Sequence, residues 1–153
     1  MKLHTALLVS LLGFLATTPA VRADEPHSAT ASKEAHAGHM LEGYAVVATA
    51  LYKDDLDAAK KAAAGMVKHD KDSAMSKSCQ AIADSTSLEE ARRHFKELSD
   101  VAIPIAREKK TMHEMNCPMA LDGQGASWLQ KSDDEIQNPY LGTRMPHCGE
   151  AVK

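Results

Sequence analysis

Between residues 41 and 105, apolar side chains recur every three or four positions, which is the spacing of one face of a helix. The first run covers 41–51. Asp54 and Asp55 then interrupt the pattern, and either can cap a second helix that we expect to run from Leu56 to about His69. The spacing therefore predicts two consecutive helices with a short break between them.

Two further helices follow from the same spacing. One covers roughly 73–83, with Met75, Cys79 and Ile82 as its inward row, so we expect Cys79 to act as a small buried hydrophobe. Ser87 with Glu90 three residues later is a capping-box signature, and it opens a helix that reaches residue 105. Pro104 is expected to kink or end that helix. The fold class that follows is all-α, an antiparallel bundle of three to four helices.

The two flanks of this region have a different texture. Residues 24–40 are polar and lack a hydrophobic period, so we expect a flexible arm there. The density of Gly and Pro in residues 111–153 predicts a largely irregular segment. Its apolar residues, including Trp128 and Tyr140, still require burial, which predicts that this segment packs on the bundle. Residues 41–153 would then form a single domain, with helices over 41–110 and a tail over 111–153.

The start of the chain has the features of a signal peptide. Lys2 precedes an apolar run over 6–16, and small residues around Val21 and Ala23 suggest cleavage after Ala23. The apolar run is about half the length of ~20 residues that a membrane span needs. We therefore expect 1–23 to be removed, leaving a periplasmic protein without a membrane span.

Charge and motifs narrow the function. The chain carries a formal net charge of −3, which becomes more negative without Lys2 and Arg22. A mildly acidic domain without a basic patch is a poor match for nucleic acid, so we expect no nucleic-acid partner. The sequence contains no phosphate-binding glycine loop, nucleophile elbow or helical His-Glu-x-x-His motif, so we do not expect an enzyme.

Soft metal ligands gather in the tail. The candidate metal ligands are Cys117, Met119, Met145 and Cys148. Thiolate and thioether sulfur select copper(I), with zinc a less favoured choice. On an extended strand Cys117 and Met119 would face the same way, and a tight bend would bring Met145 to Cys148. Candidate auxiliary ligands are the arm residues His36, His39 and Met40 and the tail residues His113 and His147.

A second interpretation of the same residues stays open. Cys117 and Cys148 are candidates for a disulfide that staples the irregular tail, and such a link is worth about 3 kcal/mol for a loop of about 30 residues. The tail methionines would then fill gaps in the core. Reduction of such a disulfide would release a pair able to bind metal. His69, His94 and His113 are more typical of surface or core histidines than of ligands.

An ordered series of motifs suggests a family. In the tail it consists of Cys117-Pro118-Met119-Ala120, Gly125-Ala126-Ser127-Trp128-Leu129, Glu135-Ile136-Gln137-Asn138-Pro139-Tyr140-Leu141-Gly142, Met145 and Cys148-Gly149. In the helices it includes Ala50-Leu51, Asp54-Asp55-Leu56 and Ala91-Arg92-Arg93-His94-Phe95-Lys96-Glu97-Leu98-Ser99. Over roughly 41–149 this series resembles the domain of unknown function 3347. That domain occurs alone in exported proteins and at the ends of periplasmic adaptor subunits of copper and other heavy-metal efflux pumps.

The resemblance implies a helical domain linked to heavy-metal handling, with Cys117, Met119, Met145 and Cys148 at matching positions. The chain departs from the family before Cys117, where Met112, His113 and Met115 replace aromatic or β-branched residues; this weakens a short strand there and adds soft ligands. The expected function is a copper-binding accessory of metal efflux or resistance. The alternative is a disulfide-stapled interaction domain that docks on an efflux adaptor or another envelope protein without metal.

Overall fold

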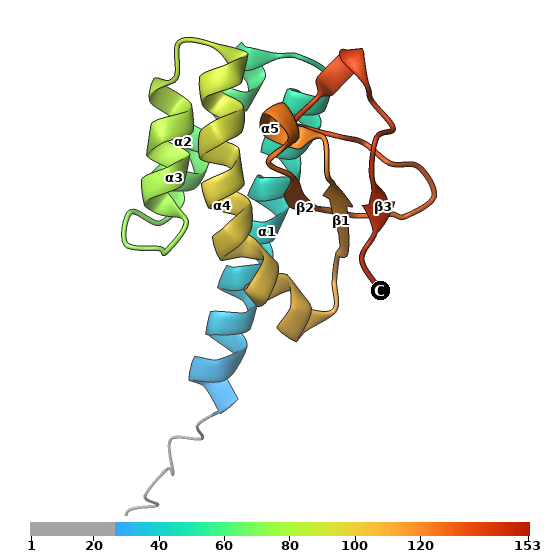
Figure 1. Cartoon of the computed structure of the whole chain (residues 1–153). Coiled ribbons are helices and arrows are strands. Elements are labelled where there is room, and N and C mark those ends of the chain that lie inside the picture. The colour runs from blue at the N-terminus through green and yellow to red at the C-terminus, as the bar shows by residue number, and fades with distance from the viewer. Residues whose placement is uncertain (1–26) are drawn as a thin grey trace, which may run out of the picture.

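The computed structural model describes residues 27–153; the expected signal peptide, 1–23, lies outside the described residues. The first part of the chain forms four helices: α1 (His27–Tyr52), α2 (Leu56–His69), α3 (Ser76–Asp84) and α4 (Leu88–Lys109). The tail forms three strands, β1 (His113–Cys117), β2 (Ala126–Gln130) and β3 (Glu150–Ala151), with short helical turns α5 (Ala120–Gly123) and η1 (Gly142–Arg144). The expectation of a mostly helical protein is confirmed, and the sheet corrects the all-α class (Figure 1).

The helix boundaries follow from local capping. The Asp55 side chain accepts a hydrogen bond from the Ala58 backbone N–H (2.9 Å), and α2 starts at the next residue, as the sequence predicts. Ser87 Oγ likewise accepts from the Glu90 N–H (3.2 Å) at the start of α4. Helix α4 continues past Pro104 to Lys109 and ends where Lys110 adopts a left-handed conformation, with φ of 52°.

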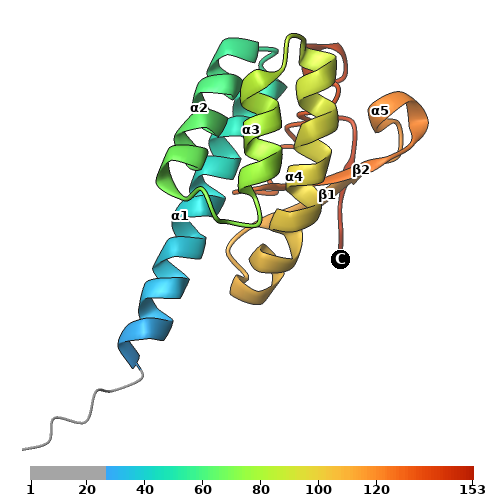
Figure 2. The ribbon, with the colours of Figure 1, turned by 90° about the vertical axis from the view of Figure 1, so that its left-hand side faces the viewer.

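Helix α1 begins earlier than the sequence pattern indicates. We expected a flexible arm over 24–40, but from His27 onward the chain belongs to α1, which extends beyond the other helices (Figure 2). The apolar stripe only begins at Met40 and Leu41, each 3% exposed, so hydrophobic periodicity could not reveal the earlier turns. Alanine, lysine and glutamate in this stretch favour a helix by intrinsic propensity.

The tail is more ordered than its Gly and Pro content suggested. Its strands form one antiparallel sheet in the order β2-β1-β3, with Met115 opposite Trp128 and Cys117 opposite Ala126. Along β1 the side chains of Met115 and Cys117 are fully buried, while His113 is exposed. This alternation of buried and exposed side chains is the period of a strand. The sequence predicts this strand only weakly, because His, Glu and Asn form strands weakly and because the residues before Cys117 depart from the family pattern.

The sheet packs against the bundle through β2 and α4. Tyr44 of α1 forms the centre of a buried polar network: its hydroxyl accepts from the Leu129 N–H (3.1 Å) and shares a hydrogen bond with Ser99 Oγ (2.8 Å). The Tyr140 hydroxyl donates to the Ser127 carbonyl (2.7 Å). Burial raises the pKa of the Tyr44 hydroxyl well above its ordinary value, so it stays protonated and can donate.

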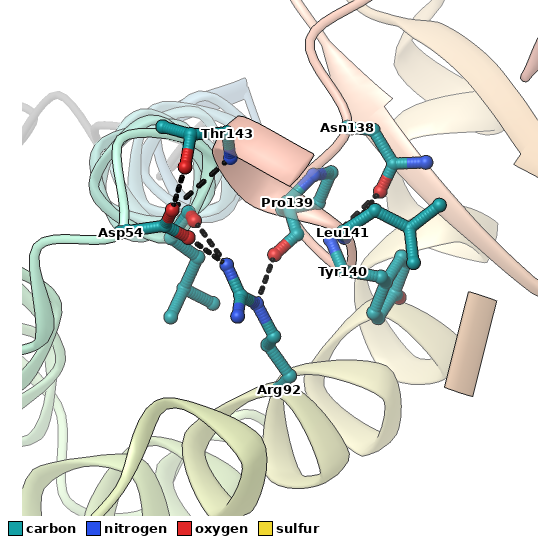
Figure 3. Close-up of polar contacts among 8 residues, drawn as sticks. Asp54, Arg92, Asn138, Pro139, Tyr140, Leu141 and Thr143 are labelled. Carbon is teal, nitrogen blue, oxygen red and sulfur yellow. Dashed lines mark hydrogen bonds and ion pairs between the residues drawn. The ribbon is translucent and has the colours of Figure 1, made fainter. Parts of the chain in front are cut away.

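A buried arginine connects α1, α4 and the tail (Figure 3). Arg92, 8% exposed, donates from Nε to the Pro139 carbonyl (2.9 Å) and from Nη2 to the Leu51 carbonyl (2.9 Å). Nη2 also forms an ion pair with the Asp54 carboxylate, which in turn accepts from the Thr143 N–H (3.1 Å). The charge on the guanidinium is thus paired and hydrogen-bonded, as a buried charge requires.

This arrangement leaves no room for a side chain at Gly142. A Cβ there would overlap the Asp54 carboxylate and the Arg92 guanidinium, and the residue has a φ of +55°. Only glycine satisfies both the close approach and the left-handed backbone.

In residues 27–153 no helix is long and apolar enough to cross a membrane.

We expect Arg92→Ala to lower the free energy of unfolding by about 3–5 kcal/mol, because it leaves the Asp54 carboxylate without its charge partner and two carbonyls without donors. Urea denaturation measures the change. The matched control is Arg93→Ala, which removes an exposed pair with Glu89 and should cost less than about 1 kcal/mol. Equal losses in the two variants would contradict the role of the buried guanidinium.

The Asp54 carboxyl makes the stability depend on pH. Partial burial by itself raises its pKa, but hydrogen bonds from Thr143 and the charged Arg92 outweigh burial and hold the pKa below its usual range. A lowered pKa stabilises the fold above the unfolded-state pKa of about 4, and this contribution is lost as pH falls through the folded-state value. Asp54→Asn should therefore flatten the fall in stability between about pH 6 and about pH 3. Urea denaturation at several pH values tests this, with the exposed Asp57→Asn as control; an unchanged slope in Asp54→Asn would refute it.

Candidate functional site

The structure brings two of the sequence-predicted site residues into contact. Cys117 ends β1 and is fully buried, whereas Cys148 lies half-buried in the loop before β3. Their sulfur atoms are 2.8 Å apart, although 31 positions separate them in the sequence. Both are thiols in this structure, as is Cys79.

Two residues fix Cys148 above the sheet. The buried Asn138 side chain donates from Nδ2 to the Cys148 carbonyl (2.7 Å), while the Asn138 backbone N–H donates to the Pro146 carbonyl (2.8 Å). Gly149 allows the close approach, since a Cβ there would lie 2.8 Å from the Trp128 ring and 2.9 Å from the Asn116 carbonyl. Sequence reasoning did not identify either residue as part of the site; their only signal was their place in the family-like motifs.

The distance between the two sulfur atoms lies between the distance in a disulfide and the distance between two thiolates bound to one metal ion. A disulfide requires about 2.05 Å. Two thiolates on one tetrahedral ion, with metal–sulfur bonds of about 2.3 Å, lie about 3.8 Å apart. The observed 2.8 Å thus needs a shift of about 1 Å or less to reach either state. The pair is suited both to oxidation and to holding an ion.

Protonation restricts how Cys148 can react. Its hydrogen bond with Cys117 is the main cause that raises the pKa of the Cys148 thiol to about 11, with burial adding to it. At neutral pH the thiol therefore keeps its proton, and a metal ion that binds as the thiolate complex must displace it.

Both candidate methionines are exposed. Met119 is 55% and Met145 is 41% exposed, whereas Met115 is fully buried. Met115 therefore fills the core, as expected if the tail methionines only fill gaps there. Met119 and Met145 do not fill the core. Their side chains are open to solvent.

The prediction that Cys117 and Met119 face the same way on one extended strand is wrong. Strand β1 ends at Cys117, and Met119 already belongs to the turn that starts α5. Consequently the Cys117 side chain enters the core while Met119 lies at the surface. The bend expected at the second cluster is present, because the Cys148 N–H donates to the Met145 carbonyl (3.2 Å).

The auxiliary candidates contact groups other than the cysteine sulfurs. The imidazole of His147 contacts the Ile136 carbonyl through Nδ1 (2.8 Å), and His113 Nδ1 lies 3.5 Å from an Asp133 carboxylate oxygen. Met40 is 3% exposed and belongs to the core, which corrects its assignment as a ligand on a mobile arm. His36 and His39 lie beside His69 of α2.

Cys79 has the structural role that the sequence predicted. Its side chain is fully buried, with the sulfur 3.7 Å from the Met66 sulfur. Burial raises the pKa of the Cys79 thiol to about 12, so this thiol keeps its proton at neutral pH and is a poor nucleophile.

A separate groove of about 650 Å³ lies between α1 and the segment 128–137. Its lining is mostly apolar and includes Val46, which is 57% exposed, together with Trp128 and Lys131. A mostly apolar concave surface is typical of a binding or contact site.

In residues 27–153 no three His, Cys, Asp or Glu side chains present their donor atoms to a common point suited to a metal ion. Comparison with protein-family models, with curated proteins and with solved structures gave no significant match. The cysteine pair and its surroundings are therefore the features of the structure that point to a function.

We expect mild oxidation to join Cys117 and Cys148 and to raise the free energy of unfolding by about 3 kcal/mol, because the link closes a loop of about 30 residues. Urea denaturation of oxidised and reduced protein measures the difference, and peptide mapping locates the bond. Cys148→Ser should abolish the difference, and Cys79→Ala should retain it. A bond that includes Cys79, or no gain in stability, would contradict this assignment.

Proposed function

We propose that this protein is a periplasmic heavy-metal-binding accessory that holds copper(I) through Cys117 and Cys148 and takes part in metal efflux or resistance. The observation that carries the proposal is the contact of these two thiols at 2.8 Å; Met119 and Met145, which lie close to them in the sequence, are exposed. The resemblance to the domain of unknown function 3347 agrees with this class of protein. We also propose that the leader over 1–23 directs its export.

The ligand chemistry supports a soft ion. Cys117 and Cys148 would each lose a proton and bind as thiolates, a choice that selects copper(I) over harder ions, with zinc less favoured. Met119 and Met145 would add neutral thioether ligands, and their exposure would let them take up an ion from solvent or pass it to a partner. Because the pKa of Cys148 is raised to about 11, protons compete with the ion, and binding should strengthen as pH rises.

Oxidation would switch this site off. Two thiols lose two protons and two electrons to a disulfide oxidant of the compartment and become the Cys117–Cys148 disulfide. Reduction by a dithiol reverses the reaction and restores both ligands. The protein would thus accept copper(I) only in its reduced form, which is also the condition in which copper(I) persists.

A second candidate function is a disulfide-stapled interaction domain without metal. The groove between α1 and 128–137, with exposed Val46, favours it, because such a surface suits an efflux adaptor or another envelope protein. In that case the cysteines would only stabilise the tail.

The deciding experiment is an anaerobic copper(I) titration of the reduced mature chain against a competing chelator. We expect one ion per chain and a loss of at least about 100-fold in affinity for Cys117→Ser, which is about 2.7 kcal/mol. Met119→Leu and Met145→Leu should each weaken binding by about tenfold, or about 1.4 kcal/mol.

Met115→Leu is the matched control, because this methionine is fully buried and should leave copper affinity unchanged. If the chelator removes copper(I) from the reduced wild-type chain throughout, the metal function is wrong and the interaction domain is favoured. Equal losses in Met115→Leu and Met119→Leu would show that the exposed methionines are not ligands.

A further inference from the structure

Three histidines from two helices meet where α2 ends beside α1. His36 and His39 lie one turn apart on α1, and His69 is the last residue of α2. The His69 ring centroid lies 4.1 Å from that of His39 and 5.4 Å from that of His36. His36 Nε2 also lies 2.6 Å from the carboxylate of Asp70, the residue that caps α2.

The two helices hold this cluster in place. Residues three apart on a helix share a face, which directs His36 and His39 to the same neighbour. Asp70 is fixed by its own backbone bond to the Met66 carbonyl (3.0 Å) and by the Asp72 N–H, which donates to its side chain (3.0 Å). The approach of His69 is therefore a product of helix packing and not of a mobile arm.

The chemistry of the cluster differs from that of the cysteine pair. Imidazole nitrogen suits divalent ions of borderline softness, such as copper(II) and zinc. Asp70 engages Nε2 of His36 and so leaves Nδ1 for an ion, which is the usual arrangement of a carboxylate behind a metal-binding histidine. The carboxyl end of α2 also carries partial negative charge, which favours a cation at His69.

The rings must move slightly to bind. Two imidazoles on one tetrahedral ion, with metal–nitrogen bonds of about 2 Å, have centroids about 5 Å apart. The 5.4 Å between the His36 and His69 rings is close to this separation, and the 4.1 Å between the His39 and His69 rings must widen by about 1 Å. Because the His36 and His69 rings are stacked with their planes 15° apart and the donors of the described residues do not yet converge, the side chains must also rotate to turn their nitrogens toward one ion. Both His39 and His69 are exposed, so rotation of their side chains meets no core contact. Without an ion, the rings simply pack on each other.

We propose that His36, His39 and His69 form a second metal site, which binds a divalent ion such as copper(II) or zinc. The site is separate from the cysteine pair and does not depend on the function proposed for it. The two sites together would let one chain hold copper in either oxidation state, with nitrogen ligands for copper(II) and sulfur ligands for copper(I).

The test uses Cys148→Ser protein, which lacks the sulfur pair, so that binding at the histidines is measured alone. Calorimetric titration with zinc chloride should show one ion per chain, and His69→Ala should weaken binding by at least about tenfold. His113→Ala is the matched control, because this exposed histidine lies outside the cluster and should have no effect. His27→Ala tests whether the start of the chain holds the ion instead.

Electron paramagnetic resonance of the copper(II) complex gives a second readout. Three nitrogen ligands are expected in Cys148→Ser protein and two after the added His69→Ala change. Asp70→Asn should keep all three nitrogens but weaken binding by about tenfold, since it acts only through His36.

Absence of zinc or copper(II) binding would overturn the proposal, as would binding that depends on His27 and not on His69. Neither result bears on the cysteine pair, which the copper(I) titration tests separately.

Discussion

The fold depends on the buried guanidinium of Arg92. One side chain of α4 binds the carbonyl at the end of α1, the carboxylate of the following loop and the Pro139 carbonyl of the tail. Removal of a charge from water costs several kcal/mol, and the Asp54 carboxylate together with two carbonyls offsets that cost. Residue 142 must then be glycine, because any side chain there would occupy the space of this ion pair. The return of the tail to the bundle is therefore fixed by polar contacts, those of Arg92 and Asp54 together with that of the Tyr44 hydroxyl, as well as by apolar burial.

The position of the cysteine pair follows from that contact. Arg92 fixes Pro139, and the neighbouring Asn138 reaches the backbone of Pro146 and Cys148. Strand β1, which ends at Cys117, is held from the other side by β2 and by the hydroxyl network around Tyr44. Strand β1 and the loop held by Asn138 thus keep the two thiols next to each other. Both a disulfide and a metal chelate require this proximity. The proposed copper function and the proposed redox control use the same geometry.

The two candidate metal sites differ in how they are supported. The cysteines lie between strand and loop, where each sulfur is held by the packed tail. The histidines lie at the surface of two helices, where His39 and His69 are exposed and pack on each other and His36 is held by Asp70. We expect the sulfur site to be the tighter of the two, and the nitrogen site to exchange its ion more readily. Such a difference suits a protein proposed to collect ions and deliver them.

The sequence alone determined the helices and much of the core. The periodicity and the caps at Asp55 and Ser87 predicted helices that the structure confirms, because both signals are local. It also identified Cys79 as a buried residue and Cys117 with Cys148 as partners either in a disulfide or around an ion. Motif order suggested a family, and that suggestion remains a proposal.

Only the tertiary structure decided the rest. Strand β1 forms from weak strand residues because β2 and β3 supply its hydrogen-bond partners, which no local pattern records. His69 joins His36 because α2 happens to end beside α1, and Met40 leaves the list of ligands because the same packing buries it. Contacts between residues 30 or more positions apart depend on the three-dimensional path of the chain, and that path is set by the burial of groups such as Arg92.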